Sequence, residues 1–308
     1  MVRYRSLVDD NARWEGFEFR PGDIVISTPK KCGTTWTQML CALLIFDGPV
    51  FPGPLEQLSP WLDMCNRPID EVRAALARQT HRRFIKTHTP LDGLTLRDDV
   101  TYVVTGRDPR DAAVSFEHHA RNMDYERFLA LRAAAMGNDD LDQFPPRAVP
   151  FDDPVEQFRW FVRDGALAGA PTLAAILHHL GTAWCRRHEP NVVLCHFADF
   201  TQDLTGELRR LAAALHIAVT PERAATLAAE AGLDRMREHA DEIAPAASQG
   251  NWKDPRAFFR SGGTGEWRDR LTADDADEYD RRVAELAPPD LATWTHLGRL
   301  ASGIDPAS

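Results

Sequence analysis

The sequence predicts a single α/β domain in which a mostly parallel β-sheet is flanked by helices. Short apolar runs alternate with longer amphipathic helical patterns, an order typical of parallel strands joined by crossover helices. No linker separates two zones of different composition, and 308 residues suffice for one large domain. Groups of polar residues follow the predicted strands, and parallel sheets bind ligands outside the carboxyl ends of their strands.

The strand predictions come from short apolar runs, and the helix predictions come from a 3.6-residue apolar period. The expected strands are Asp23–Ser27, Arg83–His88, Thr101–Thr105 and Asn191–Phe197. One helix follows Gly33 and has an apolar face of Trp36, Met39, Leu40, Leu43 and Leu44. Asp108 can cap another helix, with Pro109 at its first position. Further helices are expected over Glu71–Arg78, Pro154–Arg163, Thr172–Arg187, Leu204–Leu215, Pro221–Ala231, Asp234–Ala240 and Thr272–Leu286.

The remaining segments are expected to be irregular or terminal. Residues 1–22 are predicted to form an N-terminal segment that packs on the domain, with Trp14, Phe17 and Phe19 as apolar anchors. The domain itself is assigned to residues 23–300, and residues 301–308 are expected to fray. Proline- and glycine-containing stretches predict loops over Phe51–Pro68, Gly137–Asp153 and Ile243–Gly265.

Composition narrows the classes of function. A net charge of −10 argues against a nucleic-acid binder, although a few basic residues in one cleft can still bind a small anion. The five cysteines are widely spaced, which favours a reducing, cytoplasmic location over a disulfide framework or a metal site. No signal peptide is evident, and the longest apolar run, Met39–Phe46, is too short to span a membrane.

The loop Ser27–Trp36 is the most informative part of the chain. It joins a predicted strand to a predicted helix, so backbone N–H groups and a helix N-terminus can surround an anion there. Its lysines precede Gly33, whereas a Walker A loop has a lysine directly after its last glycine. The loop therefore indicates a phosphate binder whose chemistry differs from that of nucleoside-triphosphate enzymes. An ordinary surface turn remains the alternative.

Three further groups of residues fit the same kind of site. Lys86-Thr87-His88 ends a strand, and a histidine with an ordinary pKa can take a proton from a hydroxyl near neutral pH. Arg107 precedes a helix that carries Ser115, and arginine binds phosphate with two parallel hydrogen bonds. The segment Arg260–Trp267 combines glycines with a cation, which suits a cover over a phosphate. Each group taken alone also fits a solvated strand end, a surface ion pair or a loop.

In this order the four groups resemble the cytosolic-type sulfotransferases that use PAPS (3′-phosphoadenosine 5′-phosphosulfate), the sulfotransferase 1 family. The matching segments are Lys31-Cys32-Gly33-Thr34-Thr35-Trp36, Lys86-Thr87-His88-Thr89-Pro90, Tyr102 to Ser115, and Arg260-Ser261-Gly262-Gly263-Thr264-Gly265-Glu266-Trp267. The resemblance spans Asp23 to Thr272. It implies a three-layer fold like that of the P-loop nucleotide kinases.

The resemblance also implies a reaction and a set of roles. The sulfuryl group of PAPS would pass in line to a hydroxyl or phenol of a small, partly apolar acceptor, and PAP would be the product. His88 would be the general base, with Lys31 and Lys86 as catalytic cations and no metal. The implied nucleotide-binding residues are Lys31, Cys32, Gly33, Thr34, Thr35, Trp36, Arg107, Ser115, Phe197, Arg260, Ser261 and Gly262.

The chain also departs from the family pattern. Lys30 stands where the family has proline, Phe197 replaces a tyrosine that contacts adenine, and Ser261 replaces a lysine. The dimer segment of the family was not found, which leaves the oligomeric state open. A kinase or NTP hydrolase of related fold, or a non-catalytic nucleotide-binding protein, are the alternative functions. The acceptor site would lie among the segments Phe51–Asp63, His118–Asp124, Gly137–Phe151 and Ala244–Phe259.

Overall fold

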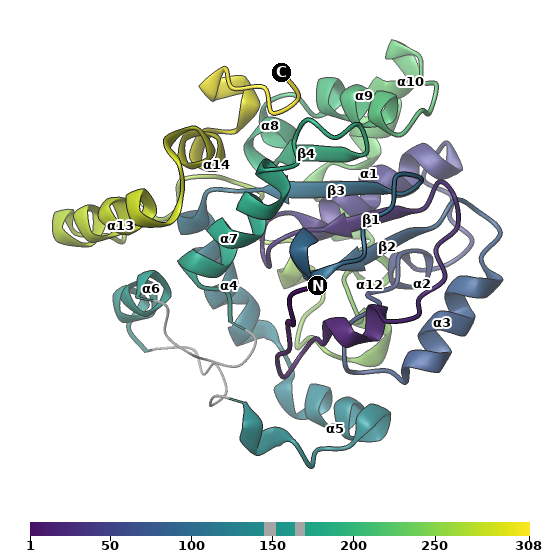
Figure 1. Ribbon diagram of the computed structural model, residues 1–308, viewed down its shortest axis with the longest axis horizontal. Helices are drawn as coiled ribbons and strands as arrows, with labels where there is room; N and C mark the ends of the chain where they lie inside the picture. Colours follow the sequence, from purple (N-terminus) through teal and green to yellow (C-terminus); the bar gives the residue numbers. More distant parts are fainter. Residues whose placement is uncertain (145–151, 164–169) are drawn as a thin grey trace.

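The computed structural model describes residues 1–144, 152–163 and 170–308. Its centre is a parallel sheet of four strands in the order β2-β1-β3-β4 (Figure 1). The strands are β1 (Ile24–Ser27), β2 (Phe84–Thr87), β3 (Thr101–Gly106) and β4 (Val192–His196). The predicted α/β fold and the four predicted strands are confirmed, each strand differing from its expected range by only one or two residues.

Side chains alternate between the two faces of the sheet, and each face has its own apolar core. In β1, Val25 belongs to the first core, whereas Ile24 and Ile26 belong to the second. Both faces are apolar because helices cover both, which is the usual state of a parallel sheet.

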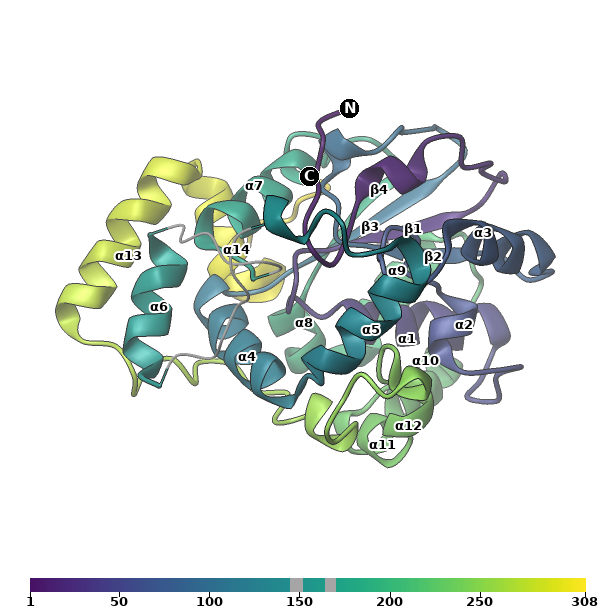
Figure 2. The same ribbon diagram turned by 90° about the horizontal axis from the view of Figure 1, so that it is seen from below.

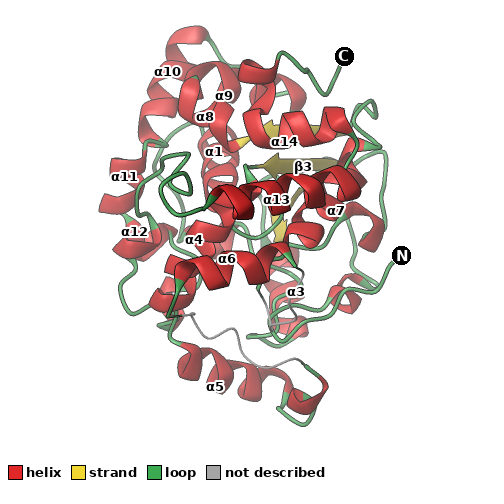
Figure 3. Ribbon diagram, turned by 90° about the vertical axis from the view of Figure 1, so that its left-hand side faces the viewer, coloured by secondary structure: helices red, strands yellow, loops and turns green. Residues whose placement is uncertain are grey.

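The first core is closed by helices from the middle and the end of the chain. They are α3 (Ile69–Arg78), α4 (Pro109–Asn122), α6 (Pro154–Val162), α7 (Leu173–Trp184), α13 (Ala273–Leu286) and α14 (Pro289–Ser302). Of these, α6 and α13 lie side by side at one end of the molecule in Figures 1, 2 and 3. Trp14, in the N-terminal segment, is buried in the same core, and Phe17 and Phe19 pack against it.

The second core is closed by α1 (Thr34–Phe46), which directly follows the predicted anion loop. The other helices on this face are α2 (Leu55–Leu58), α8 (Phe197–Gln202), α9 (Leu204–Ala214), α10 (Pro221–Glu230), α11 (Leu233–Glu238) and α12 (Ala240–Ile243). Short 3₁₀ turns complete the structure at Asn11–Trp14, Leu91–Gly93, Leu141–Gln143, Ala247–Gln249 and Arg256–Phe258.

The strand order fixes where a ligand can bind. From β1 the chain crosses to β2 on one side, and it then returns to place β3 on the other side. The connections diverge at this point, so the turns after β1 and β3 leave a crevice between them at the carboxyl edge of the sheet. The anion loop and Arg107 lie in these two turns.

The structure differs from the expectation in several elements. Helix α5 (Tyr125–Met136) was not predicted, and it lies apart from the sheet at the lower end of Figures 1 and 3. Helix α14 was also missed, because prolines flank its start and Gly298 interrupts its helical backbone. The helix expected over Asp234–Ala240 is confirmed as α11, within two residues at each end, and the separate helix α12 that follows it was not predicted.

Of the segments expected to shape the acceptor site, one is partly helical and another lies partly outside the described residues. The segment His118–Asp124 was expected to be a loop, but its residues up to Asn122 form the end of α4. Residues 145–151, which belong to the expected loop Gly137–Asp153 and to the expected acceptor segment Gly137–Phe151, lie outside the described residues.

Candidate active site

The loop between β1 and α1 turns sharply through two residues with left-handed backbone. These are Lys31, with φ of 68°, and Gly33, with φ of 95°. A Cβ atom on Gly33 would also lie 3.2 Å from the Phe197 ring, so glycine is required there for space as well as for conformation. Thr34 and Thr35 then begin α1, whose unpaired N–H groups point towards the loop.

A large cavity opens over this loop, with a volume of about 500 Å³. It is lined by all but one of the residues that the sequence predicted: Lys31, Gly33, Thr34, Thr35, Trp36, Lys86, His88, Arg107, Ser115, Phe197, Arg260, Ser261 and Gly262. The exception is Cys32, whose side chain is fully buried in the first core. Any contact of Cys32 with a ligand would therefore be through its backbone.

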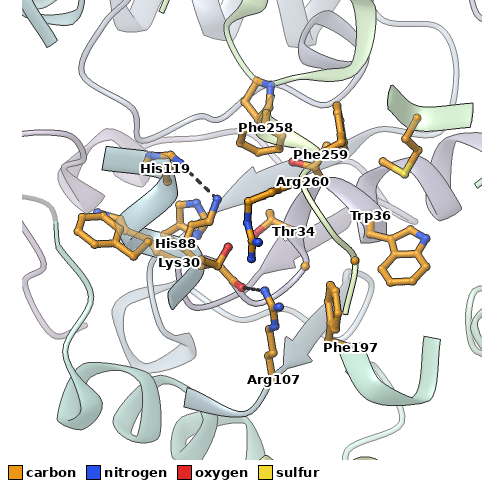
Figure 4. Close-up of a pocket in the computed structure, with 18 of the residues that line it drawn as sticks. Lys30, Thr34, Trp36, His88, Arg107, His119, Phe197, Phe258, Phe259 and Arg260 are labelled. Carbon is orange, nitrogen blue, oxygen red and sulfur yellow. Dashed lines mark hydrogen bonds between the residues drawn. The ribbon is translucent and has the colours of Figure 1, made fainter. Parts of the chain in front are cut away.

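The cavity has two ends on either side of the basic residues. Trp36 and Phe197 lie at one end in Figure 4, where the two rings pack edge to face with centroids 5.2 Å apart. We call this the nucleotide end, and we assign to it the lining residues Phe200, which packs on Trp36, Thr201, Leu204, Leu233 and Met236. His88 and His119 lie at the other end in Figure 4. We call this the acceptor end, and we assign to it Trp61, which packs on His88, Trp252, which packs on His119, and the lining residues Val8, Met64, Met123 and Tyr125.

His88 is held in a defined orientation at the end of β2. Its Nδ1 lies 2.7 Å from the carbonyl oxygen of Thr28, and its ring meets the Trp61 ring edge to face at 4.6 Å. A carbonyl only accepts, so Nδ1 carries the proton and Nε2 has a free lone pair. Burial, followed by the charges of Lys86 and Lys30, holds the pKa of His88 well below its ordinary value. His88 is therefore neutral near pH 7 and can accept a proton at Nε2.

Lys31 and Lys86 bring two ammonium groups to the same cavity. Burial, together with Arg107 and Lys86, lowers the pKa of Lys31 to about 7. Burial lowers the pKa of Lys86 to about 8, with Asp63 opposing and Lys30 adding to that shift. Both shifts come mainly from burial, and neighbouring cations add to them; an anionic ligand would stabilise the charged form of both lysines.

Arg107 is almost fully buried beneath the glycine-rich segment. Its guanidinium donates to the carbonyl oxygens of Lys31 and Gly263, each at 3.2 Å, and lies 4.1 Å from the centroid of the Phe197 ring. Its Nε is buried without a hydrogen-bond partner among the described residues. A buried unpaired donor on a cation indicates a place for an anionic ligand.

The segment Arg260–Trp267 is fastened over the cavity by its backbone. Arg237 donates to the carbonyl oxygen of Arg260 at 2.7 Å, and the N–H of Gly265 donates to the carboxylate of Asp111 at 2.8 Å. The exposed side chain of Arg260 forms an ion pair with Glu266, and Ser261 donates to the same carboxylate. Arg260 thus lines the cavity while its charge is partly engaged by Glu266.

Asp63 supports the strand end that carries His88. Its buried carboxylate accepts hydrogen bonds from the hydroxyls of Thr87 and Thr89, the two neighbours of His88, and from the indole N–H of Trp14 at 3.1 Å. Asp63 therefore positions the backbone on both sides of His88 without touching the cavity. Sequence reasoning missed this role, because the four residues come from distant parts of the chain.

The structure also accounts for Lys30, which the sequence left unexplained. Its ammonium lies 2.9 Å from the carboxylate of Asp9, so it ties the N-terminal segment to the anion loop. Val8, next to Asp9, lines the acceptor end of the cavity. The N-terminal segment is thus part of the site. No local sequence pattern could have identified this pairing.

No group of three or more histidine, cysteine, aspartate and glutamate side chains is placed to hold a metal ion in the part of the chain that the structure describes. No helix within residues 1–144, 152–163 and 170–308 is both long and apolar enough to cross a membrane.

The fold and site define an α/β protein that binds an anionic ligand at the carboxyl edge of a parallel sheet. Residues 21–288 match the sulfotransferase domain, and the chain belongs to that family. It is a sulfotransferase. The predicted family resemblance is therefore confirmed.

Named relatives place the chain within this family. It is 50% identical to a protein named glycolipid sulfotransferase from Mycobacterium bovis, over all of this chain and 97% of the relative. It is also 50% identical to a glycolipid sulfotransferase of Mycobacterium tuberculosis, with the same coverage. A mouse sulfotransferase 1B1 is 23% identical over 87% of this chain and 83% of the relative.

Solved structures show the same fold. One is retinol dehydratase in complex with androsterone and the inactive cofactor PAP. It superposes with a TM-score of 0.70 at 22% identity, covering 91% of this chain and 86% of that chain. A mouse sulfotransferase in complex with PAP has a TM-score of 0.68 at 18% identity, covering 91% and 89%.

Proposed function

We propose that this protein transfers the sulfuryl group of PAPS to a hydroxyl of a glycolipid, with His88 as the general base. The observation that carries this proposal is the orientation of His88. Its protonated Nδ1 is bonded to Thr28, and its Nε2 is left as a proton acceptor in a cavity that also contains Lys31, Lys86 and Arg107. Support for the acceptor class comes from relatives that are 50% identical and named glycolipid sulfotransferases.

The cavity residues fit the nucleotide. The buried Nε of Arg107 lacks a partner among the described residues, as does the indole N–H of Trp36, and Gly33 lines the cavity without a side chain. In this proposal Gly33, Thr34 and Thr35 hold the 5′-phosphate, with Cys32 contributing through its backbone. Arg107, Ser115 and Arg260 hold the 3′-phosphate, with Ser261 and Gly262 beside them. Trp36 and Phe197 enclose the adenine.

PAPS, when bound, supplies a sulfuryl group whose bond to a 5′-phosphate oxygen breaks as a bond to the acceptor oxygen forms. His88 takes the proton of the acceptor hydroxyl at Nε2, so the attacking oxygen gains electron density as it reacts. Lys31 and Lys86 stabilise the negative charge that develops on the leaving phosphate and the transferring group. The proton on His88 is then released to solvent.

The acceptor end suits a molecule with both a sugar and an apolar part. Trp61 and Trp252 offer flat faces of the kind that stack on sugar rings, while Met64 and Met123 provide adaptable apolar surface. Trp61 also packs against His88, so a sugar resting on this indole would have its hydroxyls near the base. A cytoplasmic location remains a prediction from the sequence alone, and the oligomeric state remains open.

The function is tested by incubating the purified protein with ³⁵S-labelled PAPS and a panel of glycolipids, phenols and simple alcohols, with ATP as a parallel co-substrate. We expect label to pass to a glycolipid and ATP to remain intact. Label on phenols alone would refute the glycolipid acceptor. ATP turnover without any sulfated product would refute the proposed reaction as a whole.

A further inference from the structure

We propose that His119 is the resting hydrogen-bond partner of the Lys31 ammonium, and that it acts as a positioning residue linking the nucleotide and acceptor ends of the cavity. The inference rests on the proposed function, since it concerns how Lys31 meets the nucleotide. The sequence did not indicate it, because His119 lies on α4, far along the chain from the anion loop.

The backbone of Lys31 lies in the anion loop, whereas its side chain reaches towards His119. Its carbonyl oxygen accepts from Arg107 at 3.2 Å, which fixes its backbone in the anion loop. Its Nζ, however, lies 3.3 Å from Nδ1 of His119 and 4.7 Å from the centroid of the Phe258 ring. In Figure 4 a dashed line marks the hydrogen bond of His119, which lies on the side of the cavity away from Trp36. The ammonium of Lys31 is therefore held by His119, at the acceptor end, and by the ring of Phe258.

His119 is itself fixed by aromatic packing. Its ring stacks on Phe116 at an interplanar angle of 22° and meets Trp252 edge to face, with centroids 4.9 Å apart. An ammonium can only donate, so Nδ1 of His119 accepts and the ring is neutral. Burial, followed by Lys31, Lys86 and Lys30, holds the pKa of His119 well below its ordinary value, which agrees with this assignment.

In this arrangement the approach of Lys31 to the nucleotide depends on the loss of its hydrogen bond to His119. To meet the 5′-phosphate, Lys31 has to give up its bond to His119. An acceptor that packs between His119 and Phe258 competes for the same space as the Lys31 ammonium and favours its transfer to the nucleotide. His119 thus opposes nucleotide binding in the free protein and couples that binding to occupancy of the acceptor end.

Calorimetric titration with PAP tests this coupling. His119→Phe keeps an aromatic ring but removes the acceptor atom, so PAP should bind more tightly, by roughly three- to tenfold. His119→Gln retains a hydrogen-bond acceptor and should bind PAP like the wild type. His118→Phe is the matched control, because His118 neighbours His119 on the same helix but does not line the cavity. In a Lys31→Met background, His119→Phe should have no effect.

Equal or weaker PAP binding by His119→Phe, or the same tightening without Lys31, would overturn the inference. If PAP fails to bind the wild type, the proposed function itself fails, and the two failures are thus distinguished. If the His119→Phe variant does not fold, a measurement on the wild type tests the inference instead. With ¹⁵N-labelled histidine, the Nδ1 resonance of His119 should move when PAP is added, and a resonance that stays in place would also overturn the inference.

Discussion

The two ends of the cavity are built in different ways. The nucleotide end adjoins the turns after β1 and β3, whose backbone N–H groups, Gly33 and Arg107 are fixed by the sheet. The acceptor end is assembled from Val8, Met64, Met123 and Trp252, which come from four distant segments. One end is therefore set by local geometry, and the other is set by how loops meet.

This difference indicates how each end can change during evolution. The turns after parallel strands are constrained on both sides by buried β-structure, so they can hold the same phosphate groups in many relatives. Loops and helix ends tolerate substitution and are free to reshape an acceptor site. Lys31 and Lys86 lie where the two ends meet, His88 lies at the acceptor end, and Asp63 fixes the strand end that carries His88.

The largest effect should follow from removing His88, the proposed base. His88→Ala should lower the rate of transfer by roughly 10²- to 10⁴-fold, because the acceptor hydroxyl then loses its proton acceptor. PAP affinity should be nearly unchanged, as measured by calorimetry beside a radiolabel transfer assay. The exposed His188→Ala is the control. Loss of PAP binding in His88→Ala would show that His88 belongs to the nucleotide end instead.

Arg107→Ala tests the nucleotide end by itself. PAP should bind about 10- to 100-fold more weakly, because a charged hydrogen-bond donor to the 3′-phosphate is lost. AMP, which lacks that phosphate, should lose far less affinity, and the ratio of the two affinities is the readout. Since Arg107 also bonds the backbone of Lys31 and Gly263, a purely structural role would weaken both nucleotides alike.

A matched pair of truncations tests whether the two ends are separable. Trp252→Ala should raise the acceptor KM about tenfold through lost apolar contact, with little change in PAP affinity. Leu204→Ala, at the nucleotide end, should weaken PAP binding about fivefold and leave the acceptor KM nearly constant. Steady-state kinetics gives the acceptor KM of each variant, and calorimetry gives its PAP affinity. If each truncation changes both ligands equally, the division of the cavity into two ends is wrong.

The same contrast explains what the sequence could and could not predict. The β1–loop–α1 unit was predicted because its strand, its glycine and its helix are neighbours in sequence, so local patterns define the geometry. The contact of Lys31 with His119 and the ion pair of Lys30 with Asp9 join distant segments, and no local pattern encodes either contact. For the same reason Asp63 was not recognised, although every residue that it bonds was visible in the sequence.

Secondary structure shows the same limit. Helix α4 was predicted because Asp108 caps it and Pro109 fits its first turn, both of which are local signals. Helix α14 was missed because Gly298, with φ of 76°, interrupts its backbone. A Cβ atom at Gly298 would lie 2.6 Å from the Asp199 carboxylate, so tertiary packing, not helix propensity, selects that glycine. The position is explained only when α8 and α14 are seen together.

The pH dependence of nucleotide binding tests the lysines between the two ends. Lys31 and Lys86 have pKa values lowered to about 7 and about 8 in the free protein, and the phosphates of PAP should raise both. The complex then holds more protons than the free protein above pH 7, so PAP affinity should fall as pH rises from 7 to 9, by no more than about tenfold per unit for each lysine. Calorimetry in buffers of different ionisation enthalpy measures this proton uptake directly.

Lys31→Met should remove the lower step and leave the upper one, because the remaining nearby cations, Arg107 and Arg260, stay charged throughout this range. Proton uptake that is unchanged in Lys31→Met would show that another group responds to the nucleotide, and the central place of Lys31 between the two ends would be lost.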